Sequence, residues 1–285
     1  VVMFGVGLAD DRWKLSARIR LVIQAGLALL MVYGGGVVLA DVGDAFFVGA
    51  LTMGFAAAVP FTVFGTVGCI NALNMVDGID GLSGTIAAGT LALIALVAGL
   101  GGDGATFLLA LALLGGVLGF LWFNLRFGNQ HRARVFMGDN GSMTLGLLLC
   151  WLLITITQGP NALVPPIVAL WIFALPLVDT LSVMFRRMWM GKSPFSPDRN
   201  HLHHLLQRAG FRVENTVGIM GTLHFALGAT GIAGAWLGVP EGVLAIGWLV
   251  VFLAYFRLTA RPWRFVPMLR GFHRAFGLTP ARNLG

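Results

Sequence analysis

The stretch Asn71-Ala-Leu-Asn-Met-Val-Asp-Gly-Ile-Asp-Gly-Leu-Ser-Gly84 lies between two long apolar runs of the chain. Two amides, Asn71 and Asn74, and two carboxylates, Asp77 and Asp80, recur every three residues, which places them on one side of a helix end. The glycines that follow favour a break in the helix and let a ligand approach the backbone closely. A polar turn between two membrane helices uses the same residue types. Other parts of the sequence are therefore needed to distinguish a simple turn from a ligand-binding site.

The composition of the chain is that of an integral membrane protein. Of its 285 residues 57% are hydrophobic and only 11% are charged, and the mean hydropathy is +0.85. Soluble globular domains do not have this composition. The net charge of +7 therefore has to be read loop by loop and does not indicate binding to nucleic acid. Cys69 and Cys150 both lie in apolar runs, so no disulfide framework is indicated.

Apolar runs long enough to cross a bilayer, about 17–25 residues, recur along the chain. They predict spans over 18–40, 46–70, 82–100, 104–125, 142–158, 162–185, 215–236 and 241–258. The apolar segment 1–9 is too short to span and is interpreted as the end of one more helix, so we expect membrane helices that precede it to be missing. The sequence thus predicts an all-α, polytopic membrane helical bundle of about eight full transmembrane helices plus the end of another, forming one integral domain over 1–258.

The loops between these spans fall into two sets that differ in charge. All 19 Lys and Arg lie in or beside one set, namely 10–20, 70–82, 126–141, 186–214 and the tail. The other set carries only the acids Asp41, Asp44, Asp103 and Glu241. The positive-inside rule therefore predicts that the first set faces the cytoplasm. The tail 259–285 mixes Arg with aromatic residues, which is typical of an interfacial segment on anionic membrane lipid or of a disordered basic tail.

Acidic residues from three different helix ends meet on the predicted cytoplasmic face. They are Asp10 and Asp11, Asp77 and Asp80, and Asp139, with arginines nearby at 12, 18, 20, 126, 132, 134 and 199. Carboxylates, arginines and a hard divalent cation such as Mg²⁺ form a site for phosphoryl transfer, because the cations neutralise and orient the phosphates. Mn²⁺ also suits oxygen ligands, so the sequence does not choose between the two metals. The membrane location indicates that one substrate is a lipid.

Four motifs in order along the chain match a known family. They are Asp10-Asp11, Asn71–Leu82, Phe136-Met-Gly-Asp-Asn-Gly-Ser142 and His201-Leu-His-His204. Together they resemble the polyprenyl-phosphate N-acetylhexosamine-1-phosphate transferases, the glycosyltransferase 4 or MraY–WecA family. The resemblance covers nearly the whole chain and is closest to members that use undecaprenyl phosphate and UDP-GlcNAc. Family members have two further helices and a cytoplasmic loop before the Asp-Asp motif, in agreement with the short first helix.

The resemblance implies a reaction in which polyprenyl (undecaprenyl) phosphate attacks the sugar-linked phosphorus of a UDP-N-acetylhexosamine. The products are polyprenyl-diphosphate-GlcNAc and UMP, in the first membrane step of O-antigen, enterobacterial common antigen or a similar surface glycan. Within the family, UDP-MurNAc-pentapeptide, UDP-GalNAc and UDP-FucNAc remain alternative donors. An ion-coupled transporter is the alternative from another class, but acids gathered at one face do not form a path through the membrane.

The resemblance also implies roles for single residues on the sugar-donor side. Asp139 and Asn74 would bind Mg²⁺, Asp80 would hold the uracil and Phe136 would stack on it. Around the uridine and the diphosphate we expect Asn71, Asp77 and Asn124. The loop after the sixth long span would contact the sugar and the diphosphate through Arg199, His201, His203 and His204. The sequence gives little support for zinc binding by His201, His203 and His204, because no Cys or fourth ligand is near them in the sequence.

On the lipid side, Asp10 and Asp11 would face the phosphate, with Arg18 or Arg20 holding it. With Asp77 and Asp139 they complete the expected catalytic set. A phosphate monoester has a second pKa of about 6, so at neutral pH a base would gain little. We therefore expect the Asp-Asp pair to position the metal and the phosphate. The sequence leaves open the glycan pathway, the polyprenol length and whether the protein is a homodimer.

Overall fold

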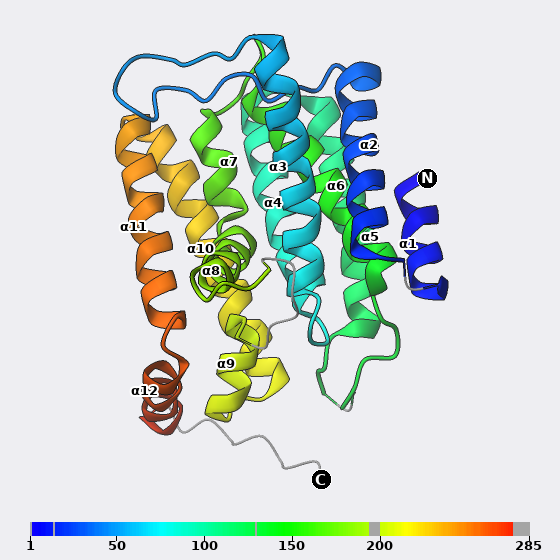
Figure 1. Ribbon diagram of the computed structural model, residues 1–285, viewed down its shortest axis with the longest axis vertical. Helices are drawn as coiled ribbons and strands as arrows, with labels where there is room; N and C mark the ends of the chain where they lie inside the picture. Colours follow the sequence, from blue (N-terminus) through cyan, green and yellow to red (C-terminus); the bar gives the residue numbers. More distant parts are fainter. Residues whose placement is uncertain (1, 14, 129, 194–199, 276–285) are drawn as a thin grey trace.

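The computed structural model describes residues 2–13, 15–128, 130–193 and 200–275 (Figure 1). This part of the chain forms twelve α-helices, and its one β feature is an isolated bridge between Asp41 and Thr52. The helices are α1 Val2–Trp13, α2 Ala17–Gly35, α3 Phe55–Val76, α4 Leu82–Gly101, α5 Gly104–Asn124, α6 Gly138–Thr157, α7 Pro166–Ile172, α8 Ala174–Trp189, α9 Leu202–Ala209, α10 Val213–Trp236, α11 Glu241–Thr259 and α12 Pro262–Ala275. The predicted all-α class is confirmed.

Seven of these helices are long and apolar enough to cross a membrane, and the bent pair α7–α8 is a candidate for an eighth span. This agrees with the eight spans expected from the sequence. The long helices run side by side, and α4 lies among α5, α6 and α10 (Figure 1). The largest fully buried side chains include Ile86, Leu91, Leu93 and Ile94 of α4. The protein is therefore a polytopic helical membrane bundle with α4 at its centre.

Close packing of α3 on α6 depends on a glycine. A Cβ at Gly146 of α6 would lie 2.7 Å from the Cα of Ile70 on α3, so a larger residue would push the helices apart. Small residues allow this kind of close backbone approach between membrane helices. The contact brings the C-terminal end of α3, with Asn74, beside the N-terminal end of α6, with Asp139.

The predicted span 46–70 and the short loop 41–45 are wrong. Residues 36–54 form one long connection, and α3 begins at Phe55 and runs on to Val76. Gly36 ends α2 in the left-handed conformation with φ of 65°, and Gln158 of the α6 end accepts hydrogen bonds from the backbone of Ala40 and Asp41. The apolar residues 46–48 resemble the start of a span by hydropathy, but they are exposed in this connection.

The predicted span 162–185 is broken instead of continuous. The two helices α7 and α8 meet at Phe173 with a bend of 81°. Pro176 has no N–H to donate to the carbonyl of Ile172, which explains why a single helix does not continue there. Figure 1 shows α8 nearly end-on, across the direction of the long helices. The bend carries Asp179 toward α9.

Two short helices that the sequence analysis did not predict, α9 and α12, lie at one end of the bundle (Figure 1). The turn 77–81 and the loop 125–137 lie at the same end of the bundle, and we call this end the basic end. Within the expected tail 259–285, α12 covers 262–275, and residues 276–285 lie outside the described part. Arg199, expected to bind substrate, also lies outside the described residues.

Candidate active site

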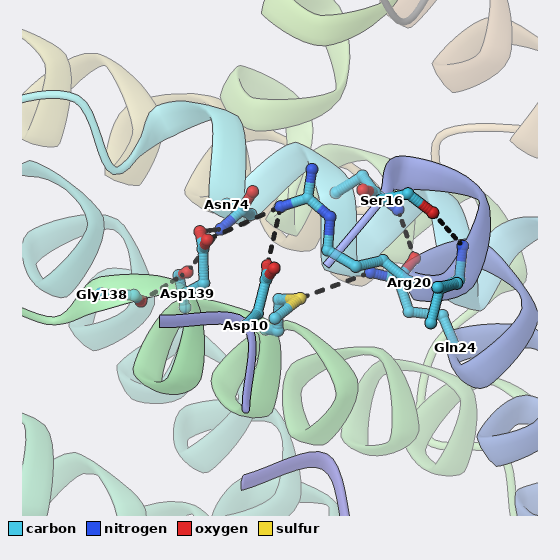
Figure 2. Close-up of polar contacts among 11 residues, drawn as sticks. Asp10, Ser16, Arg20, Gln24, Asn74, Gly138 and Asp139 are labelled. Carbon is cyan, nitrogen blue, oxygen red and sulfur yellow. Dashed lines mark hydrogen bonds and ion pairs between the residues drawn. The ribbon is translucent and has the colours of Figure 1, made fainter. Parts of the chain in front are cut away.

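The guanidinium of Arg20 lies between two of the predicted carboxylates (Figure 2). Its Nη1 is 2.9 Å from Oδ2 of Asp10 and 3.6 Å from Oδ2 of Asp139. Asp10 comes from α1, Arg20 from α2 and Asp139 from the first turn of α6, and Asp10 is only 3% exposed. One cation thus offsets the repulsion between two anions held close together. Of the two arginines predicted here, Arg20 lies in the site, whereas Arg18 is exposed.

Asn74 joins this group from the end of α3. Its Nδ2 donates to Oδ1 of Asp139 at 2.7 Å and to Oγ of Ser142 at 2.9 Å, and Ser142 donates to the carbonyl of Gly138 (Figure 2). The two predicted metal ligands, Asp139 and Asn74, are therefore adjacent. The described residues contain no group of three or more His, Cys, Asp or Glu arranged to hold a metal. The oxygens of Asp139 and Ser142 fit a partial Mg²⁺ site that phosphate oxygens complete. Asn74 presents Nδ2 to both residues here, so it would join that site with its amide turned to present Oδ1.

Asn71 lies one turn earlier on α3 and points into the bundle. Its Nδ2 donates to Oε1 of Gln24 at 2.6 Å, and Gln24 of α2 is buried. The side chain of Gln24 lies 3.5 Å from the sulfur of Met143. The Asn71–Gln24 bond ties α3 to α2 one turn behind Asn74 and Arg20, and the Gln24–Met143 contact ties α2 to α6. The expected substrate contact of Asn71 stays a prediction.

Asp80 and Asn124 bind the loop 125–137 to the turn that follows α3. Oδ2 of Asp80 accepts from Nε of Arg126 at 2.7 Å and from the backbone of Ala133 at 3.1 Å. Asn124 accepts from the backbone N–H of Gly81 and donates to the carbonyl of Val135. Asp77, the other carboxylate of the turn, accepts a hydrogen bond from Oγ of Ser83 at 2.5 Å.

This loop forms a pocket with a volume of about 670 Å³. Its lining is basic and aromatic and consists of Gln130, His131, Arg132, Ala133, Arg134 and Phe136. The ring of Phe136 is 78% exposed and stands three residues before Asp139. An exposed aromatic face beside two guanidinium groups suits a ligand with a flat ring and phosphate charge.

The predicted histidines gather around a buried carboxylate. Nδ1 of His201 is 2.7 Å from Oδ2 of Asp179, whose Oδ1 accepts from the backbone of Leu202 at 3.1 Å and from the hydroxyl of Tyr255. Asp179 of α8 therefore caps α9 and holds the ring of His201. The described partners of Asp179 lie on α9 and α11 and at the residue before α9, beyond its own helix.

His203 connects these histidines to the turn after α3. Its ring lies 5.8 Å from that of His201 and 4.1 Å from that of His204. It also fills the space where a side chain at Gly78 would stand. Burial, followed by the neighbouring His204, lowers the pKa of His203 to about 3, so the ring is neutral at neutral pH. The side chain of Asp11 lies outside the described part.

The sequence did not show which side chains hold the predicted residues in place. Gln24, Arg126 and Ser142 hydrogen-bond to Asn71, Asp80 and Asn74, respectively. Tyr255 reaches the site through Asp179, which binds His201. Most of these residues lie more than 40 positions from their hydrogen-bond partners in the chain, so spacing in the sequence could not predict the pairs. A usable signal was polarity: a Gln or Asp inside an apolar span is costly unless it is paired.

The fold and the site define an integral membrane protein with a carboxylate–arginine centre at one end of its helical bundle. Residues 1–157 match the model of glycosyl transferase family 4. This region contains Asp10, Arg20, Asn74, Asp80 and Asp139. The match covers more than half of the chain, and the chain belongs to this family.

Relatives extend the similarity beyond the matched region. The undecaprenyl-phosphate alpha-N-acetylglucosaminyl 1-phosphate transferase of Escherichia coli K12 is 34% identical over 268 residues, which are 92% of this chain and 71% of that protein. The enzyme of the same name from Haemophilus influenzae is 35% identical over 96% of this chain and 77% of its own length. The one from Yersinia pestis is 36% identical over 94% and 73%.

The bond from Tyr255 to Asp179 predicts a measurable stability effect. Tyr255→Phe leaves the buried carboxylate with one donor fewer, so we expect a loss of about 1–3 kcal/mol, seen as a lower melting temperature in detergent. Tyr33→Phe is the matched control, because Tyr33 is 68% exposed on α2. In a double-mutant cycle with His201→Gln, the two losses should be smaller together than their sum, since they share Asp179. Strictly additive stability losses would contradict the conclusion that Tyr255 and His201 act through the same carboxylate.

The lowered pKa of His203 predicts a pH effect on stability. The unfolded chain binds a proton at this residue below about pH 6.5, whereas the folded chain does so only near pH 3. Stability from neutral His203 is therefore present above pH 6.5 and is lost as the pH falls. We expect the melting temperature to fall between pH 7.5 and pH 5, and His203→Gln to flatten part of this fall. His131→Gln, in an exposed loop, is the control; equal slopes in all three proteins would refute the assignment.

Proposed function

We propose that this chain transfers N-acetylglucosamine 1-phosphate from UDP-GlcNAc to undecaprenyl phosphate, giving undecaprenyl-diphosphate-GlcNAc and UMP. The observation that carries the proposal is Arg20 held between Asp10 and Asp139, with Asn74 bonded to Asp139. This centre combines a cation for phosphate with oxygen donors for a metal. The names of the relatives describe the same transfer, and the family model matches the region of the centre.

An apolar groove between α2 and α3 supports the lipid substrate. It has a volume of about 530 Å³ and is lined by Leu21, Ala25, Leu29, Val59, Pro60, Val63, Phe64 and Val67. Leu21 follows Arg20 on α2, and the groove then runs over eight residues of the helix, or about 12 Å, away from the centre. A polyprenyl chain in this groove would place its phosphate at Arg20.

The pocket of the loop 125–137 suits the nucleotide. Phe136 offers a ring face for the uracil, and Arg132 and Arg134 offer guanidinium groups for the diphosphate. Asp80 and Asn124 hold this loop against the turn after α3. We therefore give Asp80 a positioning role through Oδ2, while its other oxygen stays a candidate for the predicted uracil contact.

In the reaction, an oxygen of the lipid phosphate bonds to the sugar-linked phosphorus of UDP-GlcNAc. The bond from that phosphorus to the oxygen bridging the two phosphates breaks, and UMP leaves. Arg20 neutralises the attacking phosphate as it approaches the donor. Asp10 orients Arg20 through their 2.9 Å contact. A role for Asp10 as general base is not needed, because the phosphate is already largely a dianion at neutral pH.

Mg²⁺ fits the oxygen donors beside this centre. Asp139 and Asn74 would hold it, and when bound it would neutralise charge on the diphosphate of the donor. Mn²⁺ suits the same donors. UDP-MurNAc-pentapeptide, UDP-GalNAc and UDP-FucNAc carry the same nucleotide, so the assay below includes other donors.

We also propose that the basic end faces the cytoplasm at the bacterial inner membrane. The Lys and Arg of the described residues lie in the loops and short helices of this end and at the helix ends beside them, which the positive-inside rule assigns to the cytoplasm. A nucleotide sugar is available there. The lipid groove begins beside the same end. The lipid would therefore reach Arg20 from the bilayer, and the nucleotide sugar would reach it from the cytoplasm.

The experiment is UMP release by the full chain in detergent with undecaprenyl phosphate, Mg²⁺ and each UDP-sugar in turn. We expect UMP from UDP-GlcNAc only, abolished by EDTA and lowered about 10²–10³-fold by Asp139→Asn. Asp103→Asn makes the same chemical change in a loop at the opposite end and should leave the rate unchanged. UMP from another donor would change the sugar, and no UMP from any donor would overturn the proposal.

The groove predicts selective effects on the lipid. Val63→Phe places a ring in the groove, so we expect the KM for undecaprenyl phosphate to rise roughly tenfold, equivalent to about 1.4 kcal/mol. The KM for UDP-GlcNAc should not change. Leu109→Phe on the exposed face of α5 is the matched control. An equal rise in both KM values would show a general distortion and count against a lipid groove.

A further inference from the structure

The helix α12 follows a membrane span almost without a linker. Only Ala260 and Arg261 separate it from α11. Arg186 of α8 donates to the carbonyl of Thr259 at 3.2 Å and anchors this junction. Figure 1 shows that α12 turns away from the direction of α11 and lies beside α9. A helix connected in this way is held at the level of the lipid headgroups.

One face of α12 packs on the segment that carries the histidines. Phe265, Val266 and His273 are buried, and the ring of His273 lies 4.8 Å from that of Phe211, edge to face. Arg270 donates to the carbonyl of Arg208 near the end of α9 at 3.2 Å. His203 lies on α9 and His201 directly precedes it, so α12 packs on the helix that carries the histidines of the site.

The opposite faces of α12 combine bulky apolar and basic side chains. Trp263, Met268 and Phe272 are 68%, 55% and 50% exposed. Arg261, Arg264 and Arg274 are exposed among them. From Thr259 to the last residue the sequence contains no Asp or Glu. Aromatic and Met side chains that insert between headgroups, beside guanidinium groups that bind phosphates, match the surface of an anionic bilayer.

We propose that α12 binds anionic phospholipid and that this binding steadies α9 and its histidines over the donor site. On a neutral bilayer the arginines lose their partners, and the inner face of α12 holds α9 less firmly. The expected consequence is a weaker affinity for the nucleotide sugar with little change in kcat. This part rests on the proposed function, whereas the binding of α12 to lipid does not.

The test uses the full chain in nanodiscs of phosphatidylcholine, with or without about one third phosphatidylglycerol. Hydrogen exchange of 262–275 and 202–209 reports binding, and UMP release reports the KM for UDP-GlcNAc. We expect slower exchange in both segments and a KM about threefold lower on the anionic discs, with the difference shrinking in 0.5 M salt as charges are screened (Debye length about 4 Å). Exchange is read even if no UMP forms, so failure of the proposed function is recognised separately.

The variant Arg264→Gln/Arg274→Gln should abolish the lipid dependence and behave on anionic discs as the wild type does on neutral ones. Lys192→Gln, which removes an exposed charge elsewhere at the basic end, is the control and should keep the dependence. Equal exchange and equal KM on both discs would overturn the proposal. Slower exchange in α12 alone, with α9 and the KM unchanged, would overturn the coupling to the site.

Discussion

The structure depends on holding three charges, Asp10, Arg20 and Asp139, close together at the end of an apolar bundle. A carboxylate as deeply buried as Asp10 is costly without a cation. Arg20 supplies that cation and reaches Asp139 as well. The three residues come from different helices, so the ion pairs can form only where α1, α2 and α6 end at the same level. This is also the arrangement that a site for phosphates needs.

Packing in the membrane sets that level. Gly146 lets α6 approach α3 until their backbones nearly touch, and Asn71 and Gln24 join α3 to α2 through a partly buried hydrogen bond. Asn74 is then within 2.7 Å of Asp139. A small residue in the apolar layer thus decides the geometry of a polar site one or two turns away. Hydrophobicity alone would not fix this register, since lipid tails are as apolar as the helices.

The second half of the chain reaches the same site through Asp179. The bend between α7 and α8 directs this carboxylate toward α9, where it binds His201 and caps the helix. Tyr255 of α11 adds a third donor. His203 then packs against Gly78, directly after Asp77 of the first polar stretch. The site is therefore closed by a contact between residues more than 120 positions apart, and α12 supports that contact from outside.

The sequence by itself determined the helical membrane class, the sorting of charge to one end and the motif residues, because hydropathy and charge are local properties of the chain. Tertiary structure decided which motif residues meet. It placed Arg20 between Asp10 and Asp139. It set the hydrogen bonds by which Asp80 and Asn124 hold a loop, and the partners of Asp179. It also broke the span at Phe173 and moved the start of α3 to Phe55. These outcomes depend on helix register and long-range hydrogen bonds, which no local pattern records.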